Sequence, residues 1–208
     1  MERPRAPQRT RKRIFEAARK EFAAKGFAGA RMEGIARRAG VSKQLILHHF
    51  KSKESLYSEI HDVLSRPSFQ SLELDDYLQS RRYDLIADRF HKRVKNLDYV
   101  RLLTWEAAGI RNRALPNEEE RKGHIAQRGE AIRLLQAAGR LPKEMNYRML
   151  QLAIVSLASY PLSFSEITRL ITGYRSTDPK FQRQWSKFLR QLGKLLTVSA
   201  KDNGRPPS

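Results

Sequence analysis

A single glycine between two short amphipathic segments is the feature that most restricts how this chain can fold. The first segment, residues 31–39, carries its apolar side chains on one helical face: Met32, Ile35, Ala36 and Ala39. Gly40 follows, and because glycine adopts a positive φ at little cost, it permits a sharp turn there. Ser42 then stands where the next helix, residues 43–50, needs an N-cap. The sequence therefore predicts two short helices joined by a tight turn, the second ending near Lys51.

The two predicted helices have the residue distribution of a helix-turn-helix. Their apolar residues can form a small shared core: Ile35, Ala36, Ala39, Val41, Ile46 and Phe50. The second helix then turns four other side chains outward: Lys43, Gln44, Leu47 and His48. In helix-turn-helix proteins such residues enter the major groove of DNA and meet base edges. Gln44 can pair with adenine and Lys43 with guanine, or both can contact phosphate alone, and the sequence leaves both interpretations open.

Helical spacing recurs along the whole chain. No segment has the alternating pattern of a strand, so we predict an all-α fold. A first helix is expected from Thr10 to Gly26, and another from Ser52 until Pro67. Two late segments are strongly apolar, residues 145–160 on nearly all sides and residues 181–196 along one stripe.

Positive charge is the main compositional signal. The chain has 41 Lys and Arg against 22 Asp and Glu, a formal net charge of +19, and 15 of the basic but only 6 of the acidic residues lie in residues 1–60. This imbalance indicates a polyanionic partner, which is DNA, an acidic membrane surface or an acidic protein. A protein that coats DNA regardless of sequence is the first alternative to a sequence reader.

The sequence argues against several other classes of function. Without Cys there are no disulfides, thiolate nucleophiles or Cys-based zinc sites. No Gly-rich phosphate loop, H-E-x-x-H or G-x-S-x-G motif is present, so we predict that the protein is not an enzyme. His48 and His49 point about 100° apart on a helix, and we predict no metal site. Residues 150–164, the most apolar stretch, are too short to span a membrane, which favours a cytoplasmic protein.

The segment around the predicted helix-turn-helix resembles a known family. Three stretches carry the resemblance: Gly26-Phe27, Met-Glu-Gly-Ile-Ala-Arg-Arg-Ala-Gly-Val-Ser at residues 32–42, and His-His-Phe-Lys-Ser-Lys-Glu-Ser-Leu-Tyr at residues 48–57. They are similar to the tetracycline-repressor (TetR) family of transcriptional regulators. The resemblance is specific over residues 10–60 and weaker further on, at residues 101–106 and 171–179.

The resemblance implies an N-terminal three-helix helix-turn-helix DNA-binding domain and a C-terminal helical domain for ligand binding and dimerisation. We place a flexible basic arm at residues 1–9, the DNA-binding domain at 10–55, the effector-binding and dimerisation domain at 56–200, and a disordered tail at 201–208. The implied function is that of a repressor bound as a homodimer to a palindromic operator in double-stranded DNA. A small-molecule effector, of unknown identity, releases it by changing the separation of the two DNA-binding domains, and no cofactor is implied.

Carried over position by position, the resemblance also implies the residues that contact DNA: Arg31, Ser42, Lys43, Gln44, Leu45, Leu47, His48, His49, Lys51 and Lys53. Two of these depart from the family pattern. Leu47 stands where the family often has Tyr, so it cannot donate a hydrogen bond to phosphate but can touch a thymine methyl. Arg31 stands where Thr is frequent, so it cannot cap the helix but can pair with phosphate.

Two more sets of residues are candidates for binding. The first is a possible effector pocket, although the same residues can fill a solid core instead: Tyr77, Phe90, Tyr99, Leu102, Leu103, Trp105 and Glu106. The second is a possible dimer interface, because the late apolar segments exceed what one small domain readily covers: Met149, Ala153, Leu157, Phe181, Trp185, Phe188, Leu189 and Leu192. The alternative to the dimer is a monomer that buries both helices.

Overall fold

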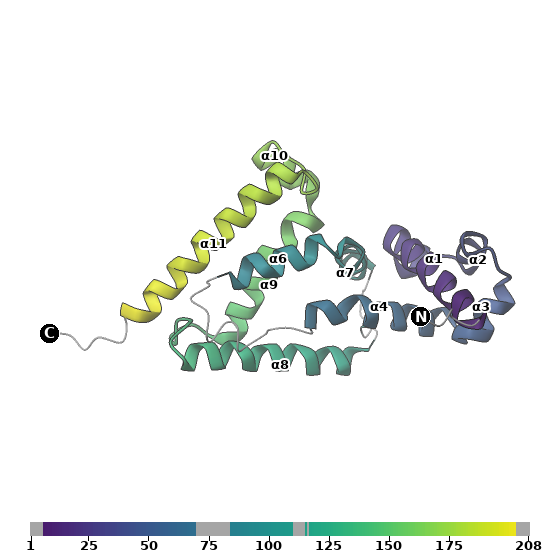
Figure 1. Cartoon of the computed structure of the whole chain (residues 1–208), viewed down its shortest axis with the longest axis horizontal. Helices are drawn as coiled ribbons and strands as arrows, with labels where there is room; N and C mark the ends of the chain where they lie inside the picture. Colours follow the sequence, from purple (N-terminus) through teal and green to yellow (C-terminus); the bar gives the residue numbers. More distant parts are fainter. Residues whose placement is uncertain (1–5, 70–83, 110–114, 116, 203–208) are drawn as a thin grey trace. The chain divides into compact units, whose positions relative to one another are not determined.

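The computed structural model describes residues 6–69, 84–109, 115 and 117–202, and over these ranges the chain forms helices and no strand. This confirms the predicted all-α class. The chain divides into two compact units, Met1–Arg66 with Asp98–Glu118, and Pro67–Leu97 with Glu119–Ser208. Figure 1 shows the helices of both units coloured along the sequence.

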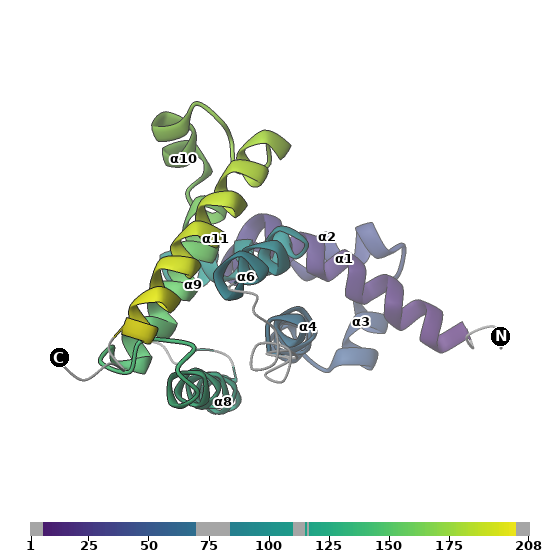
Figure 2. The same ribbon diagram turned by 60° about the vertical axis from the view of Figure 1, so that its left-hand side comes forward.

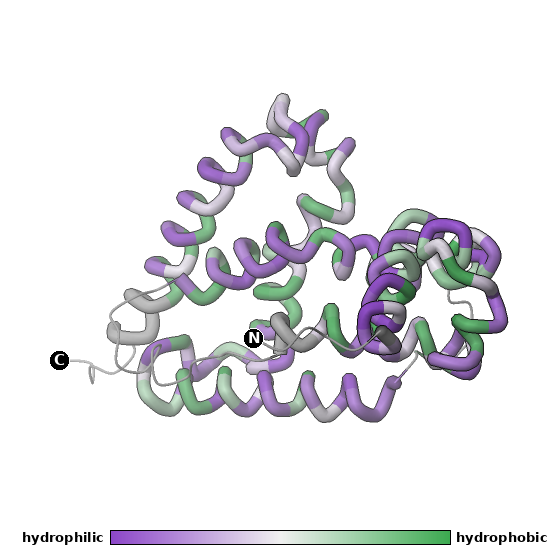
Figure 3. Tube along the Cα trace, turned by 45° about the vertical axis from the view of Figure 1, so that its right-hand side comes forward, coloured by the Kyte–Doolittle hydropathy of each residue, from purple (hydrophilic) through white to green (hydrophobic). Residues whose placement is uncertain are grey.

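Among its described residues, the first unit is built from five helices: α1 (Ala6–Gly29), α2 (Met32–Ala39), α3 (Lys43–Phe50), most of α4 (Lys53–Phe69) and nearly all of α7 (Leu97–Gly109). α1 packs against α2, and α2 packs against α3. Every helix sends a fully buried side chain into one core: Ile14, Phe22, Ile35, Ile46, Tyr57 and Leu102. Figure 3 shows apolar and polar positions interleaved along these helices, the pattern expected where one face packs inward and the other meets water.

The second unit contains the remaining helices: α6 (Leu85–Val94), α8 (Glu118–Ala137), α9 (Tyr147–Ser163), α10 (Ser165–Thr172) and α11 (Pro179–Asp202). α6 packs against both α9 and α11, as Figures 1 and 2 show. The core of this unit draws on four helices: Phe90, Ile132, Leu135, Ile154, Phe181 and Leu189. The indole N–H of Trp185 donates to the carbonyl of Leu157 at 3.2 Å, which ties α11 to α9.

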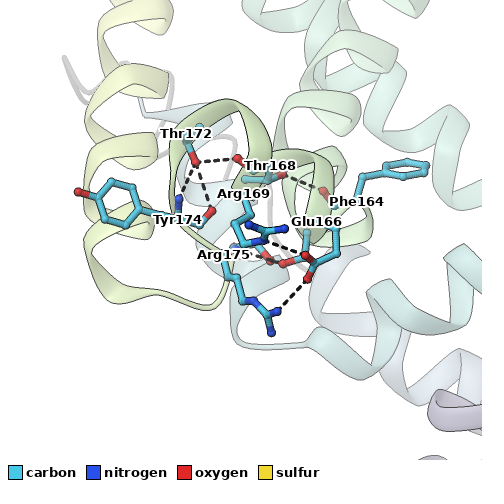
Figure 4. A network of polar contacts seen from close by, with 9 residues as sticks. Phe164, Glu166, Thr168, Arg169, Thr172, Tyr174 and Arg175 are labelled. Atoms are coloured by element: carbon cyan, nitrogen blue, oxygen red, sulfur yellow. Dashed lines mark hydrogen bonds and ion pairs between the residues drawn. The ribbon is translucent and has the colours of Figure 1, made fainter.

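A polar network holds α10 and the loop that follows it (Figure 4). Glu166 accepts a hydrogen bond from Arg169 at 2.9 Å and forms an ion pair with Arg175 at 3.3 Å. The hydrogen bond from Arg169, helped by the positive charge of Arg175, lowers the pKa of Glu166 below its ordinary value. Nearby, the Thr172 hydroxyl donates to the Thr168 carbonyl at 2.7 Å.

Several predicted boundaries differ from the observed ones by a few residues. α1 begins at Ala6, so residues 6–9 of the predicted flexible arm are helical and Thr10 is not the N-cap. Gly26 interrupts the regular helix of α1 where the sequence predicts its end, with φ 67° and ψ 178°, although α1 continues beyond this kink to Gly29. α4 continues through Pro67 to Phe69, and α11 reaches Asp202, into the predicted tail. Residues 1–5 and 203–208 lie outside the described ranges.

The border between the units also lies elsewhere than predicted. The sequence places the end of the first domain at residue 55, whereas the first unit extends to Arg66 and takes in Asp98–Glu118. Leu56 and Ile60 are both 0% exposed and pack in the core with α1, which makes α4 part of the first unit. An apolar stripe shows that a helix is buried but does not show which neighbours bury it.

Within the described ranges, no three His, Cys, Asp or Glu side chains form a group that could hold a metal ion. Over the same ranges, no single helix is long and apolar enough to cross a membrane. α9 and α10 satisfy that length and composition test only when taken together, and the pair is bent by 88°.

Candidate nucleic-acid interface

The turn between α2 and α3 has the geometry that the sequence predicted. Gly40 has φ 63° and ψ 44°, a left-handed conformation that favours glycine. Its N–H donates to the Arg37 carbonyl at 3.2 Å, and the N–H of Val41 donates to the Ala36 carbonyl at 3.1 Å. The guanidinium of Arg13, on α1, donates to the Gly40 carbonyl at 3.1 Å. The turn is therefore fastened to α1 as well as closed by its own backbone.

Ser42 begins α3 in the way predicted. Its Oγ accepts a hydrogen bond from the N–H of Leu45 at 3.2 Å, which satisfies one of the free donors at the start of the helix. Ile46 and Phe50 are 0% and 4% exposed and hold the inner face of α3 in the core. Arg31 precedes α2 and makes no side-chain cap there, as expected. The first unit thus holds α3 in a defined orientation.

The candidate DNA-contacting residues lie together on and beside α3. Seven are exposed: Arg31, Ser42, Lys43, Gln44, Leu47, His48 and Lys51. Three are partly buried: Leu45, His49 and Lys53. Leu47 is 38% exposed, so a leucine on the outer face of α3 remains open to an apolar contact. The outer face of α3 is a mixed polar and apolar surface, which is the composition needed to meet base edges in a groove.

Lys43 is paired within the first unit, with a residue that sequence analysis missed. Its Nζ donates to Oε1 of Glu33 at 2.8 Å, joining the starts of α2 and α3. This hydrogen bond is the largest cause of the lowered pKa of Glu33. Both side chains are about half exposed or more, 49% for Lys43 and 62% for Glu33, so water competes for the pair and phosphate can displace the carboxylate. The two residues are ten apart in sequence, and only the crossing of two helices brings them together.

Two other cations pack on aromatic rings of the first unit. Nζ of Lys53 lies 4.6 Å from the centroid of the Phe27 ring. The Arg11 guanidinium lies 4.9 Å from the centroid of the Phe50 ring and forms an ion pair with Glu59 at 2.6 Å. Such contacts stabilise the fold by about 0.5–1 kcal/mol at exposed sites. Lys53 and Arg11 therefore stabilise the packing of the first unit, and they also add to its positive charge.

The candidate effector residues do not form one group. Phe90 is 0% exposed in the core of the second unit, whereas five others belong to the first unit: Tyr99, Leu102, Leu103, Trp105 and Glu106. Tyr99 and Leu102 fill the core there, which was the alternative for these residues. Trp105 and Glu106 line a cavity of about 880 Å³. Tyr77 lies outside the described residues.

The candidate dimer residues divide between core and surface. Phe181 and Leu189 are 3% and 0% exposed, so they serve the core of the second unit rather than a contact between copies. Met149 and Phe188 are 60% and 46% exposed. Four of the candidates line an apolar groove of about 460 Å³ between α9 and α11: Met149, Ala153, Leu157 and Leu192. The α11 stripe therefore has an inner and an outer part, which its spacing alone did not separate.

Comparisons with known proteins agree with this site. Residues 14–60 match the bacterial regulatory proteins of the tetR family. The HTH-type transcriptional repressor SCO4008 of Streptomyces coelicolor is 31% identical over 169 residues, covering 81% of this chain and 86% of that protein. The HTH-type transcriptional repressor NicS of Pseudomonas putida is 26% identical over 196 residues, covering 88% of this chain and 90% of that protein.

Solved structures show the same architecture. SCO4942 from Streptomyces coelicolor has a TM-score of 0.67 at 25% identity, covering 88% of this chain and 97% of the other. NalD, the secondary repressor of the MexAB-OprM multidrug efflux pump in Pseudomonas aeruginosa, has a TM-score of 0.61 at 25% identity, covering 90% and 95%.

A capped, outward-facing second helix on a basic helical unit defines a helix-turn-helix DNA-binding protein. The chain belongs to the TetR family of bacterial regulatory proteins. It is accordingly a transcriptional regulator and not an enzyme. Members of this family bind operator DNA as dimers and respond to small-molecule effectors.

Proposed function

We propose that this protein represses transcription in the cytoplasm by binding a palindromic operator as a homodimer, and that a small-molecule effector releases it. The observation that carries the proposal is α3, which is capped by Ser42, held at its start by the Gly40 turn and exposed along Lys43, Gln44 and His48. Two copies related by a twofold axis place two such helices about 34–36 Å apart for half-sites one turn of DNA apart.

Within each half-site, Gln44 and Lys43 read bases. Gln44 has the fork of donor and acceptor that matches adenine, and Lys43 reaches guanine after leaving Glu33. Leu47 contacts a thymine methyl in place of a phosphate hydrogen bond. Arg31, Lys51 and Lys53 lie beside phosphate, and the basic side chains of residues 1–9 add attraction that salt screens.

The second copy covers the apolar surface of α9 and α11. Met149 and Phe188 are large apolar side chains left about half exposed or more, and the groove beside Met149 is lined by further apolar residues. An apolar surface of this kind on two long helices is typical of an interface between copies. The dimer then fixes the spacing of the two α3 helices.

The test is selection of bound duplexes from a random pool at about 150 mM salt, a level at which purely electrostatic binding is much reduced. We expect one palindrome to be enriched. Gln44→Ala should relax the preference at one position of each half-site by about 1–3 kcal/mol. Gln127→Ala, an exposed glutamine on α8 in the second unit, is the matched control and should change nothing.

Two outcomes contradict the proposal. If unrelated duplexes survive selection equally, the protein coats DNA without reading it, and its charge is its function. If a single half-site is enriched and sedimentation shows only 24.1 kDa species, the protein reads DNA as a monomer.

A further inference from the structure

The first unit contains a cavity of about 880 Å³ that the recognition surface does not use. It lies between the end of α1, the start of α4 and the end of α7, and all of its described lining belongs to the first unit. Three aromatic residues line it, Phe27, Tyr57 and Trp105, together with polar Ser58 and Asn117 and charged Lys25, Glu54 and Glu106. It is partly open to solvent, and its volume is in the range of clefts that hold a drug-sized ligand.

Aromatic rings form the apolar wall of the cavity. Phe27 and Tyr57 pack edge to face with centroids 5.2 Å apart, and Phe22 supports Tyr57 from the core at 5.0 Å. Trp105 is anchored by its indole N–H, which donates to the Ala23 carbonyl at 3.3 Å, yet 43% of the residue is exposed. A fixed, half-exposed indole in a cavity that two other rings also line is a surface on which a flat aromatic molecule can stack.

The polar groups of the cavity are engaged with one another. The Tyr57 hydroxyl donates to Oε1 of buried Glu106 at 2.9 Å. Ser58 donates to Asn117, and Asn117 donates in turn to Asp62 at 2.8 Å. These hydroxyl, amide and carboxylate groups can hydrogen-bond to a ligand at its edge, while the wall remains largely apolar. This combination suits an aromatic molecule with one or two polar substituents.

The cavity touches the chain on both sides of the helix-turn-helix. Gly26 and Phe27 come shortly before α2, and Ser55 and Tyr57 come shortly after α3. Gly26 is also the kink of α1, and a Cβ built there would lie 3.0 Å from Cγ of Trp105. A ligand that moves the Trp105 ring therefore presses on the kink from which the chain enters α2.

We propose that this cavity is a regulatory site for an aromatic compound with polar substituents, which acts on the helix-turn-helix from within the first unit. The proposal rests on the proposed function for its readout, the release of operator DNA. Occupancy displaces the Trp105 ring against Gly26 and shifts α2 and α3 relative to α1. A site so placed acts on each DNA-binding unit directly, in addition to any change in the spacing of the two copies.

Binding is tested with the neutral fluorescent probe N-phenyl-1-naphthylamine on the full chain. In a Trp185→Phe background Trp105 is the only tryptophan, so quenching of its emission by the probe reports occupancy of the cavity. Ala108→Phe fills the cavity from α7 and should weaken probe binding by about tenfold or more. Ala107→Phe, exposed on the same helix and absent from the described lining, is the matched control and should leave it unchanged.

A further variant separates this cavity from the apolar groove of the second unit. Ala153→Phe fills that groove and should not alter quenching of Trp105. One result would overturn the proposal: Ala108→Phe keeps the melting temperature of the parent and binds the probe as tightly, while Ala153→Phe no longer binds the probe. The probe would then occupy the groove of the second unit.

Coupling to DNA is tested with the duplex enriched by selection. Saturating probe should lower operator affinity by about fivefold or more in the parent and not in Ala108→Phe. Probe binding without any change in operator affinity overturns the regulatory role and leaves operator reading intact.

If no duplex is preferred, the proposed function fails separately. The effect of the probe on the helix-turn-helix is then measured by hydrogen exchange of its backbone amides. Faster or slower exchange of α2 and α3 amides on probe binding then supports the site, and unchanged exchange overturns it.

Discussion

Gly34→Ala offers a test of how α1 and α2 pack, because two effects of known size oppose each other there. Gly34 lies inside α2, where replacing glycine by alanine normally stabilises a helix by about 1 kcal/mol. A Cβ at this position would lie 2.8 Å from Oε1 of Glu21, closer than real contacts allow. The Glu21 side chain is 3% exposed and its Oε1 accepts from Lys25 at 2.6 Å, so it cannot swing freely into water.

The balance should favour destabilisation. If the Glu21 carboxylate stays in place, crowding costs about 1–3 kcal/mol; if it moves aside instead, the hydrogen bond that it gives up costs a similar amount, about 1.5–3 kcal/mol. Against the helix gain of about 1 kcal/mol, we expect Gly34→Ala to lower the free energy of unfolding by about 1 kcal/mol. In a Glu21→Ala background the obstructing oxygen is gone, and the same substitution should stabilise the first unit by about 1 kcal/mol.

The assay is urea unfolding followed by Trp105 emission in the Trp185→Phe background, because Trp105 reports the first unit alone. The four proteins of the cycle give the coupling energy between positions 21 and 34, expected at about 2 kcal/mol. Stabilisation by Gly34→Ala with Glu21 in place would mean that the carboxylate moves aside at no cost. Equal destabilisation in both backgrounds would mean that the contact with Glu21 is not the cause.

Three further predictions concern the start of α3, the Glu166 network of α10, and the contrast between Leu189 of α11 and Met149 of α9. Ser42→Ala should destabilise the first unit by about 1 kcal/mol through loss of the N-cap, and Ser42→Asp should retain most of it, as measured by urea unfolding. The hydrogen bond from Arg169 is the largest cause of the lowered pKa of Glu166. A lowered pKa contributes stability that is present above the ordinary pKa of about 4.5 and is lost as the pH falls below it. Glu166→Gln should therefore flatten the dependence of the melting temperature on pH between about pH 5 and 2. Leu189→Ala should cost the second unit about 2–5 kcal/mol by calorimetry, whereas Met149→Ala should leave folding nearly unchanged and weaken dimerisation in sedimentation experiments.

Each of these has a distinct contrary result. Equal stability of Ser42→Ala and the parent would show that the cap is dispensable. An unchanged acid profile in Glu166→Gln would assign the acid loss to other carboxylates. A dimer that dissociates equally with and without Met149→Ala would place the contact between copies away from the groove.

The elements that sequence predicted well depend on few neighbours. Gly40 forms the turn because the backbone there needs a positive φ, and Ser42 caps α3 because the first turn of that helix needs a hydrogen-bond acceptor. Both requirements depend only on neighbouring residues. Ser52 caps α4 in the same way, accepting from the N–H of Ser55 at 3.0 Å. The helical class, the helix-turn-helix and the outward face of α3 follow from such local rules and from periodicity.

Features that join distant segments were not predictable in this way. Trp105 of α7 lies so close to the Gly26 kink that a Cβ at Gly26 would be 3.0 Å from its Cγ, and no pattern near residue 26 predicts this contact with residue 105. Likewise Phe181 and Phe188 share one stripe of α11, yet the first is buried and the second is exposed. Periodicity identifies the apolar side of a helix but not how much of it neighbouring helices cover.

What the sequence by itself determined was therefore the recognition helix and the protein family, because the signals for both lie within residues 10–60. The tertiary structure decided that α4 and α7 belong to the DNA-binding unit, that Glu33 holds Lys43, and that a cavity adjoins both ends of the helix-turn-helix. The physical reason is that local conformation depends on adjacent residues. Contacts and cavities depend on how helices cross, which the whole core sets at once.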